Sequence, residues 1–104
     1  MGRVLWGNLA WHPAAAAWRA VAPTAPTPDC IEILHADNGN AVYRLVGAGS
    51  SGAPIIARRS GKARALIVRT LYEKMLSRLP LTLPRYRAFR VEGPEYAWVF
   101  LEER

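Results

Sequence analysis

The sequence predicts an α+β fold in which a five-stranded, mostly antiparallel sheet carries one helix between its third and fourth strands. Two observations support this prediction. Apolar and polar residues alternate, as in half-buried strands, over 30–59 and again over 85–101. Between these segments, Ala63–Leu79 has helical spacing and contains neither proline nor glycine. The chain of 104 residues has the length of a single domain.

Residues 1–28 differ in composition from the rest and are interpreted as an N-terminal extension and linker before a main domain at residues 29–104. His12-Pro13 followed by four alanines predicts a short helix to about Ala20, because proline is tolerated at the first helical position. A proline-rich segment, 21–28, leads into the domain. We expect this tryptophan-rich extension to pack on the flank of the domain, with a partner-binding strip as the alternative.

The strands follow from the alternation and from the turn residues between the apolar segments. Asp37-Asn-Gly-Asn40 joins the first two strands as a tight hairpin turn, and Gly93-Pro94 separates the last two. The glycine-rich loop 47–52 lacks the Gly-Lys-Ser/Thr ending and the following helix of a P-loop, so it is interpreted as a linker between strands. The strands are expected at 30–35, 41–46, 54–59, 85–92 and 96–101.

The helix is predicted over Ala63–Leu79, where Ile67 and Leu71 recur at helical spacing and Val68 lies beside them. With about 100° per residue these side chains share one face, which we expect to pack against the sheet. Pro80 ends the helix, because proline disfavours the helical conformation of the residue before it. The chain order is therefore β-β-β-α-β-β after the extension.

Composition argues against several function classes. Twelve arginines and two lysines give a net charge of +6, but they are spread from Arg3 to Arg104 and form no stripe, which argues against nucleic-acid binding. The single cysteine, Cys30, allows no intrachain disulfide and suits a reducing compartment. The sequence has neither a membrane-length apolar run nor a credible targeting signal, so we expect a cytoplasmic protein that does not enter a membrane.

Four local segments follow one another along the chain: Ala41-Val-Tyr-Arg-Leu45, Pro54-Ile-Ile-Ala-Arg-Arg59, Arg69-Thr-Leu-Tyr-Glu-Lys-Met-Leu76 and Trp98-Val-Phe-Leu-Glu-Glu103. In this order they resemble the N-terminal lobe of the protein-kinase-like fold, and more narrowly the aminoglycoside phosphotransferase family with its choline-kinase-like members. The resemblance covers about residues 31–103. It implies an ancestral ATP-dependent phosphorylation of a small-molecule hydroxyl.

The resemblance also assigns roles to individual positions. Arg58 stands where the family has the lysine that holds the α- and β-phosphates of the nucleotide, and Val68 stands where the helix supplies the glutamate that braces this lysine. Glu73, the only acid of the helix, is expected to face away from the sheet, so both halves of the ion pair are changed. The segment 37–40 corresponds to the loop that folds over the phosphates, although its sequence also fits a plain hairpin turn.

At the hinge, the resemblance implies that backbone groups of Glu102 and Glu103 contact adenine and that Phe100 lines the back wall of the cleft. The alternative is that Phe100 and Trp98 are ordinary strand residues. The catalytic base and the carboxylates that hold Mg²⁺ come from a second lobe in this fold. We therefore expect a partial phosphotransferase lobe that binds ATP weakly, uses Mg²⁺ only with the missing lobe, and either meets that lobe or self-associates. The alternative function is a non-catalytic module that docks a partner through the open face of the sheet.

Overall fold

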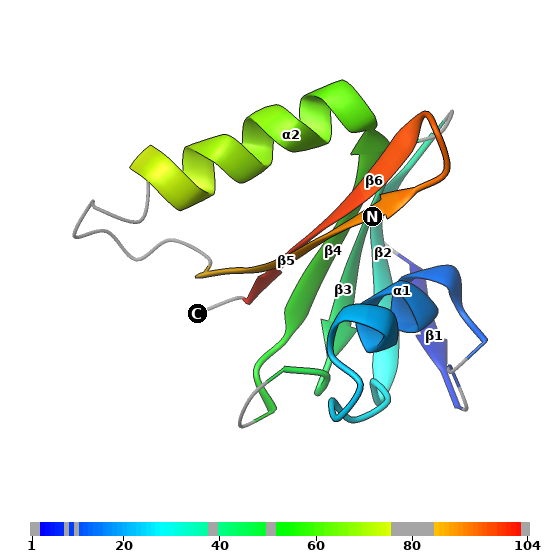
Figure 1. The fold of residues 1–104 in the computed structure, drawn as a ribbon. Helices are drawn as coiled ribbons and strands as arrows, with labels where there is room; N and C mark the ends of the chain where they lie inside the picture. The colour runs from blue at the N-terminus through cyan, green and yellow to red at the C-terminus, as the bar shows by residue number, and fades with distance from the viewer. Residues whose placement is uncertain are drawn as a thin grey trace.

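The computed structural model describes residues 3–7, 9, 11–37, 40–49, 52–75 and 85–102. Over these ranges the chain forms an open, six-stranded antiparallel sheet with two α-helices, which confirms the α+β class (Figure 1). The strands are β1 (Arg3–Trp6), β2 (Cys30–Ala36), β3 (Ala41–Val46), β4 (Ile55–Gly61), β5 (Arg85–Glu92) and β6 (Tyr96–Glu102), and the helices are α1 (Pro13–Val21) and α2 (Lys62–Thr70). The order across the sheet is β1-β2-β3-β4-β6-β5.

The sheet has one strand more than the sequence predicts. Arg3–Trp6 forms β1, which pairs antiparallel with β2 from Arg3 opposite Ile33 to Trp6 opposite Cys30. The prediction of five strands is wrong because β1 has only four residues, and its extended conformation depends on hydrogen bonds to a strand more than twenty residues further along the chain. The extension therefore contributes a strand as well as a helix.

Helix α1 begins at Pro13 and ends at Val21, close to the predicted bounds. It covers one face of the sheet, and its Trp18 is buried there with its ring centroid 5.2 Å from that of Phe100. The Trp18 indole N–H donates a hydrogen bond of 3.1 Å to the carbonyl of Ala48. The predicted packing of the extension on the domain is thus confirmed. Two other tryptophans of the segment, Trp6 and Trp11, are exposed.

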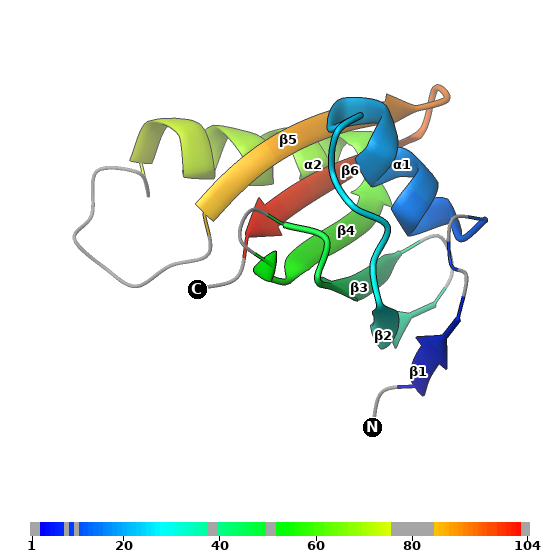
Figure 2. The ribbon, with the colours of Figure 1, turned by 90° about the horizontal axis from the view of Figure 1, so that it is seen from below.

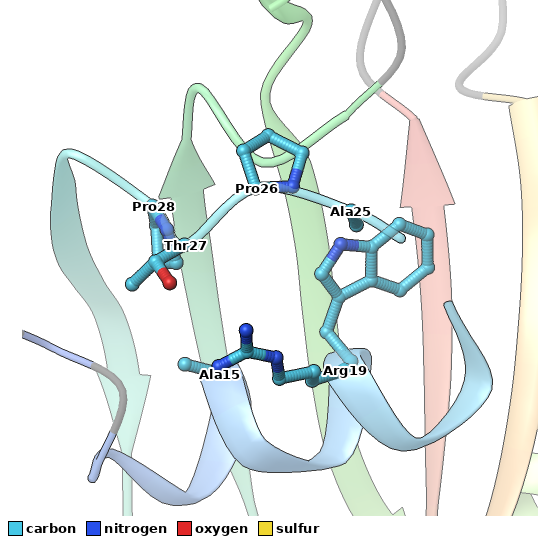
Figure 3. A pocket seen from close by; sticks show the side chains of 7 residues that line it. Ala15, Arg19, Ala25, Pro26, Thr27 and Pro28 are labelled. Atoms are coloured by element: carbon cyan, nitrogen blue, oxygen red, sulfur yellow. The ribbon is translucent and has the colours of Figure 1, made fainter. Parts of the chain in front are cut away.

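The linker after α1 folds back over the helix beside Trp18 (Figure 3). Ala25, Pro26, Thr27 and Pro28 close a cavity of about 10 Å³ against α1. A volume of this size holds at most a single water molecule. The segment Ala25–Pro28 is therefore packed closely against α1.

Helix α2 covers the opposite face of the sheet, as the view from below shows (Figure 2). It packs through Ala65 and Val68 against a cluster that β6 and its neighbours form, and a π-helical turn, Leu71–Met75, continues it. The rest of the predicted helix, 76–79, lies outside the described residues. The cluster consists of Ala65, Ala97, Val99 and Leu101, with Ile56, Val68 and Phe89 packed against it.

The prediction that Ile67 and Leu71 face the sheet is wrong, because both side chains point away from it and are exposed. The small side chain of Ala65 allows the helix to approach the sheet closely on the Ala65–Val68 side. The apolar residues on the other side are then left outside. In the described part of the chain, neither helix is long and apolar enough to cross a membrane.

The N-terminus of α1 predicts a pH-dependent stability. Buried His12 caps this helix, since its Nδ1 accepts a hydrogen bond of 3.1 Å from the backbone N–H of Ala14, and the Tyr43 ring packs edge-on against it at 4.8 Å. Burial lowers the pKa of His12 below its ordinary value. The unfolded chain, whose histidine titrates near pH 6.5, therefore takes up the proton first. The contribution of neutral His12 to stability is fully present above about pH 6.5 and is lost as the pH falls through the lower pKa of the folded chain.

We expect urea unfolding at a series of pH values to show this decline between pH 7 and pH 5. In His12→Asn, which keeps a capping acceptor but does not titrate, the decline should be much smaller. His35→Gln, which removes the other histidine of the chain, is the matched control and should retain it. An equal decline in wild type and His12→Asn would show that His12 is not the titrating group.

Candidate functional site

Arg58 lies on an interior strand, β4, between β3 and β6. Its cross-strand neighbours are Val42 on β3 and Val99 on β6. Because side chains alternate along a strand, Arg58 shares its face with Ile56 and Ser60, and Val99 places this face on the side of α2. Arg58, the predicted phosphate-binding residue, is therefore on the same side of the sheet as α2.

The Arg58 side chain is partly buried and has no ionic partner among the residues that the structure describes. Within the described residues it makes no hydrogen bond, ion pair or ring contact. The next residue, Arg59, faces the other way, where its Nε donates a hydrogen bond of 2.7 Å to Glu92 and its guanidinium stacks over the ring of Tyr96 at 4.0 Å. The contrast matters because partly buried arginines normally have such partners. Arg58 is held by apolar neighbours with its donors available to an anion.

Arg58 lies at the boundary between a covered and an uncovered part of this face. Helix α2 packs over β4, β5 and β6, whereas the part formed by β1 to β3 extends beyond the helix (Figure 1). The uncovered part includes Arg44, whose guanidinium pairs with Glu32 at 3.2 Å, and Val42. An anion that reaches Arg58 would approach over this uncovered part.

A second polar group on the same face, Ser60, has no hydrogen-bond partner in the described part of the chain. Ser60 is buried, and its Oγ finds no hydrogen-bond partner among the described residues. It is separated from Arg58 by one residue of β4, and both side chains project to the α2 side. A buried hydroxyl without a partner is costly. Arg58 and Ser60 thus give this face a cation and an unsatisfied hydroxyl in succession.

The structure places no carboxylate in the bracing position. Val68 packs in the apolar cluster with Val99, the cross-strand neighbour of Arg58. Glu73 is exposed, and its Oε1 lies 3.3 Å from Nε of Arg69, one turn earlier along the helix. Arg58 is therefore positioned by packing and strand pairing and has no ion pair with α2.

Phe100 does not belong to the face that carries Arg58. It is fully buried on the α1 side, where its ring stacks with Trp98 at 6.0 Å and contacts Trp18. Its cross-strand neighbour on β4 is Ala57, one residue from Arg58 and on the opposite face. The structure therefore does not bring Phe100 and Arg58 together, and the alternative that Phe100 is an ordinary strand residue describes its position.

Glu102, which the resemblance assigns to a hinge, is the last residue of β6. Glu102 pairs with Ile55 on one side and Arg85 on the other, and its Oε1 lies 3.8 Å from Nε of Arg87. The side chain of Glu102 lies on the same face as that of Phe100. Glu103 lies outside the described residues.

Two apolar residues that the sequence does not single out, Ile56 and Leu101, flank Arg58 on its own face. Ile56 precedes it by two positions, and Leu101 on β6 is the cross-strand neighbour of Ile56. The alternation within β4 was sufficient to find Ile56. Leu101 could not be found in this way, because the pairing of β4 with β6 is not encoded in either segment alone.

A larger cavity, of about 310 Å³, lies on the α1 side of the sheet. Its charged walls include Arg59, Glu92 and Asp37, and Tyr43 and Trp98 add aromatic surface. Glu92 accepts hydrogen bonds from both Arg59 and Trp98, and Asp37 pairs with His35 at 2.9 Å. The charges in this cavity are thus balanced internally, which makes it a weaker candidate for an ionic ligand than the Arg58 face.

Cys30 offers no reactive nucleophile. It is buried, and burial together with the negative charges of Glu32 and Asp29 raises the pKa of its thiol. The thiol therefore stays protonated at neutral pH, whereas a reactive cysteine requires a lowered pKa.

The Arg58 face has the chemistry of an anion-binding surface. A guanidinium without a partner can hold a phosphate or carboxylate in a bidentate manner, and the neighbouring apolar residues can cover a flat organic group. The described residues of this face add Glu32, but its carboxylate already pairs with Arg44. In comparisons with known proteins, no family model, curated protein or solved structure matches the chain.

Proposed function

We propose that this chain is the N-terminal lobe of an aminoglycoside-phosphotransferase-like fold and that it forms half of a nucleotide site, in which Arg58 holds the phosphates of ATP. The observation that carries the proposal is the guanidinium of Arg58, partly buried on an interior strand and without a partner among the described residues. The order of strands and helix from β2 to β6 agrees with the expected β-β-β-α-β-β arrangement.

The residues of the Arg58 face fit parts of ATP to different degrees. The planar guanidinium suits phosphate oxygens, although it cannot replace a lysine as a compact point charge. Partly buried Ile56 offers apolar surface for the base, a role that Phe100 cannot fill from the other side of the sheet. The carboxylate that the described residues of this face offer, Glu32, is paired with Arg44, so the carboxylates for Mg²⁺ and the catalytic base would belong to a second unit. This chain would bind and orient the nucleotide without completing the transfer.

A second candidate function is partner docking on the open part of the same face. Trp6 is 73% exposed, and Val4 is exposed on the same side of β1. Their cross-strand neighbours, Cys30 and Glu32, belong to the side of the sheet on which Arg44 and Arg58 lie. Exposed large apolar residues of this kind mark interaction surfaces when they are contiguous.

Calorimetric titration with ATP and Mg²⁺ tests the nucleotide half-site. We expect wild type to bind with a Kd between micromolar and millimolar, about −8 to −4 kcal/mol. Arg58→Ala should weaken binding about tenfold or more, through loss of a charge-assisted contact. Arg90→Ala is the matched control, because it removes an exposed strand arginine on the opposite face, and it should bind like wild type. Absence of heat at millimolar ATP, or equal losses in the two variants, would refute the half-site and favour partner docking.

A further inference from the structure

The outer side of α2 is an apolar stripe that nothing in the described chain covers. Ile67 is 62% exposed, Leu66 is 41% exposed and Leu71 is 39% exposed. Together with Thr70 they line a shallow groove of about 280 Å³ (the helix is seen from the side in Figure 1). Exposure of three adjacent large aliphatic side chains is unfavourable in water, so a surface of this kind is expected to have a partner.

The charges along this stripe are mainly positive. Arg64 lies one turn before Ile67 in α2, and Lys74 lies in the π-helical turn that continues the helix; both side chains are exposed. The nearest acid, Glu73, is already paired with Arg69. Within the described part of the chain, neither Arg64 nor Lys74 pairs with an acid, so the stripe has a cation towards each end.

A second copy of this chain is a poor occupant. The chain carries a net charge of +6, and two copies that met through α2 would bring Arg64 and Lys74 of each into one basic interface. Like charges brought together in an interface cost binding free energy. The charge pattern instead complements a partner with acidic residues.

We propose that the outer face of α2 docks an amphipathic helix of another protein, with an apolar stripe that covers Leu66, Ile67 and Leu71 and with acidic flanks that meet Arg64 and Lys74. From Arg64 to Lys74 the helix rises about 15 Å, which matches three turns of a partner helix. Helical ligands of apolar grooves place anchors at this spacing. The stripe faces away from Val68 and the Arg58 face, so the inference is independent of the proposed nucleotide site.

Two synthetic peptides test this inference by fluorescence anisotropy. One is a three-heptad amphipathic helix with leucine on one face and glutamate on its flanks, and its twin has lysine in place of every glutamate. We expect the glutamate peptide to bind the full chain, more weakly as salt is raised, and the lysine peptide not to bind. Ile67→Ser should weaken the binding of the glutamate peptide about tenfold, because one buried anchor is lost.

The matched control is Leu34→Ser, which removes an exposed apolar side chain on β2, away from the strands that α2 covers, and should leave the affinity unchanged. A double variant, Arg64→Ala with Lys74→Ala, should keep an Ile67-dependent interaction but lose most of its salt dependence. Equal binding of the two peptides, no binding of either, or equal losses in Ile67→Ser and Leu34→Ser would overturn the proposal. So would a dimer in sedimentation that Ile67→Ser dissociates, because the occupant would then be a second copy.

Discussion

Replacement of Phe100 by alanine is expected to lower the free energy of unfolding by about 3–5 kcal/mol. Phe100 is fully buried on β6, where its ring contacts Trp18 of α1 and Trp98 of β6. Its removal leaves a cavity lined by two large rings. Trp18 is held by its hydrogen bond to Ala48 and Trp98 by its hydrogen bond to Glu92, so neither ring moves freely into the space. Such a loss is a large part of the 5–15 kcal/mol typical of a whole domain. Urea unfolding followed by tryptophan fluorescence measures it.

A milder substitution of Phe100 tests whether this residue also contacts the nucleotide. Phe100→Leu retains most of the buried volume and should leave a folded chain, with a smaller loss of about 1–2 kcal/mol. Because Phe100 faces α1, the affinity of the folded Phe100→Leu chain for ATP should equal that of wild type. A lower affinity in this variant with an intact fold would return Phe100 to the wall of the nucleotide site, against the placement described above.

The second large effect is expected from a carboxylate introduced opposite Arg58. Val68→Glu places an acid in the cluster that contains Val99, next to Arg58 across the strands. With Arg58 present, the new pair should limit the loss of stability to about 1–3 kcal/mol. In the Arg58→Ala background the same carboxylate has no partner, and Val68→Glu should cost about 1–2 kcal/mol more.

A double-mutant cycle from urea unfolding measures this coupling directly. Val68→Gln serves as the matched control, because it has nearly the same shape without the charge and should show no coupling to Arg58. If Val68→Glu and Arg58→Ala are additive within about 0.5 kcal/mol, Arg58 does not reach the inner side of α2. The proposed site would then have to lie over β3, away from the helix.

Much of the fold could be predicted because the patterns involved are local. The strands Ala41–Val46 and Arg85–Glu92 have the predicted bounds, since alternation and turn residues determine them within a few positions. The start of α1 at Pro13 follows from the proline itself. β1 could not be predicted in the same way, because four residues carry too short a pattern and its partner strand is distant in sequence.

The orientation of α2 shows why a helical pattern can be right and its buried side wrong. Leu66, Ile67, Val68 and Leu71 spread apolar character over more than half of the helix circumference. Spacing alone then leaves the choice of buried side open. The small Ala65 side chain lets the helix approach the sheet closely, and this determines which side is buried. A hydrophobic periodicity does not contain the sizes of the side chains.

The candidate site was predictable only in part, because the sequence of a strand does not reveal its register with its neighbour. Arg58 was found from the segment that surrounds it, and its position on β4 is consistent with the proposed role. Phe100 was found from its segment too, but a shift of one residue between paired strands moves a side chain to the other face. The pairing of Arg58 with Val99, and not with Phe100, is a property of the register and could not be read from either strand alone.

The position of β6 between β4 and β5 has a kinetic consequence. The three strands β2, β3 and β4 form a meander of adjacent hairpins, which can form through short loops. The next strand in the sheet, β6, has to join β4 across the whole segment from Gly61 to Tyr96, with Glu102 reaching Ile55. Loop closure of this length has to precede burial of either core cluster, so we expect a folding rate limited by this one non-local pairing, in the slower range of small domains. Until it forms, the early meander exposes an unpaired edge that can capture the same segment of another chain, so this step is also where domain swapping would begin.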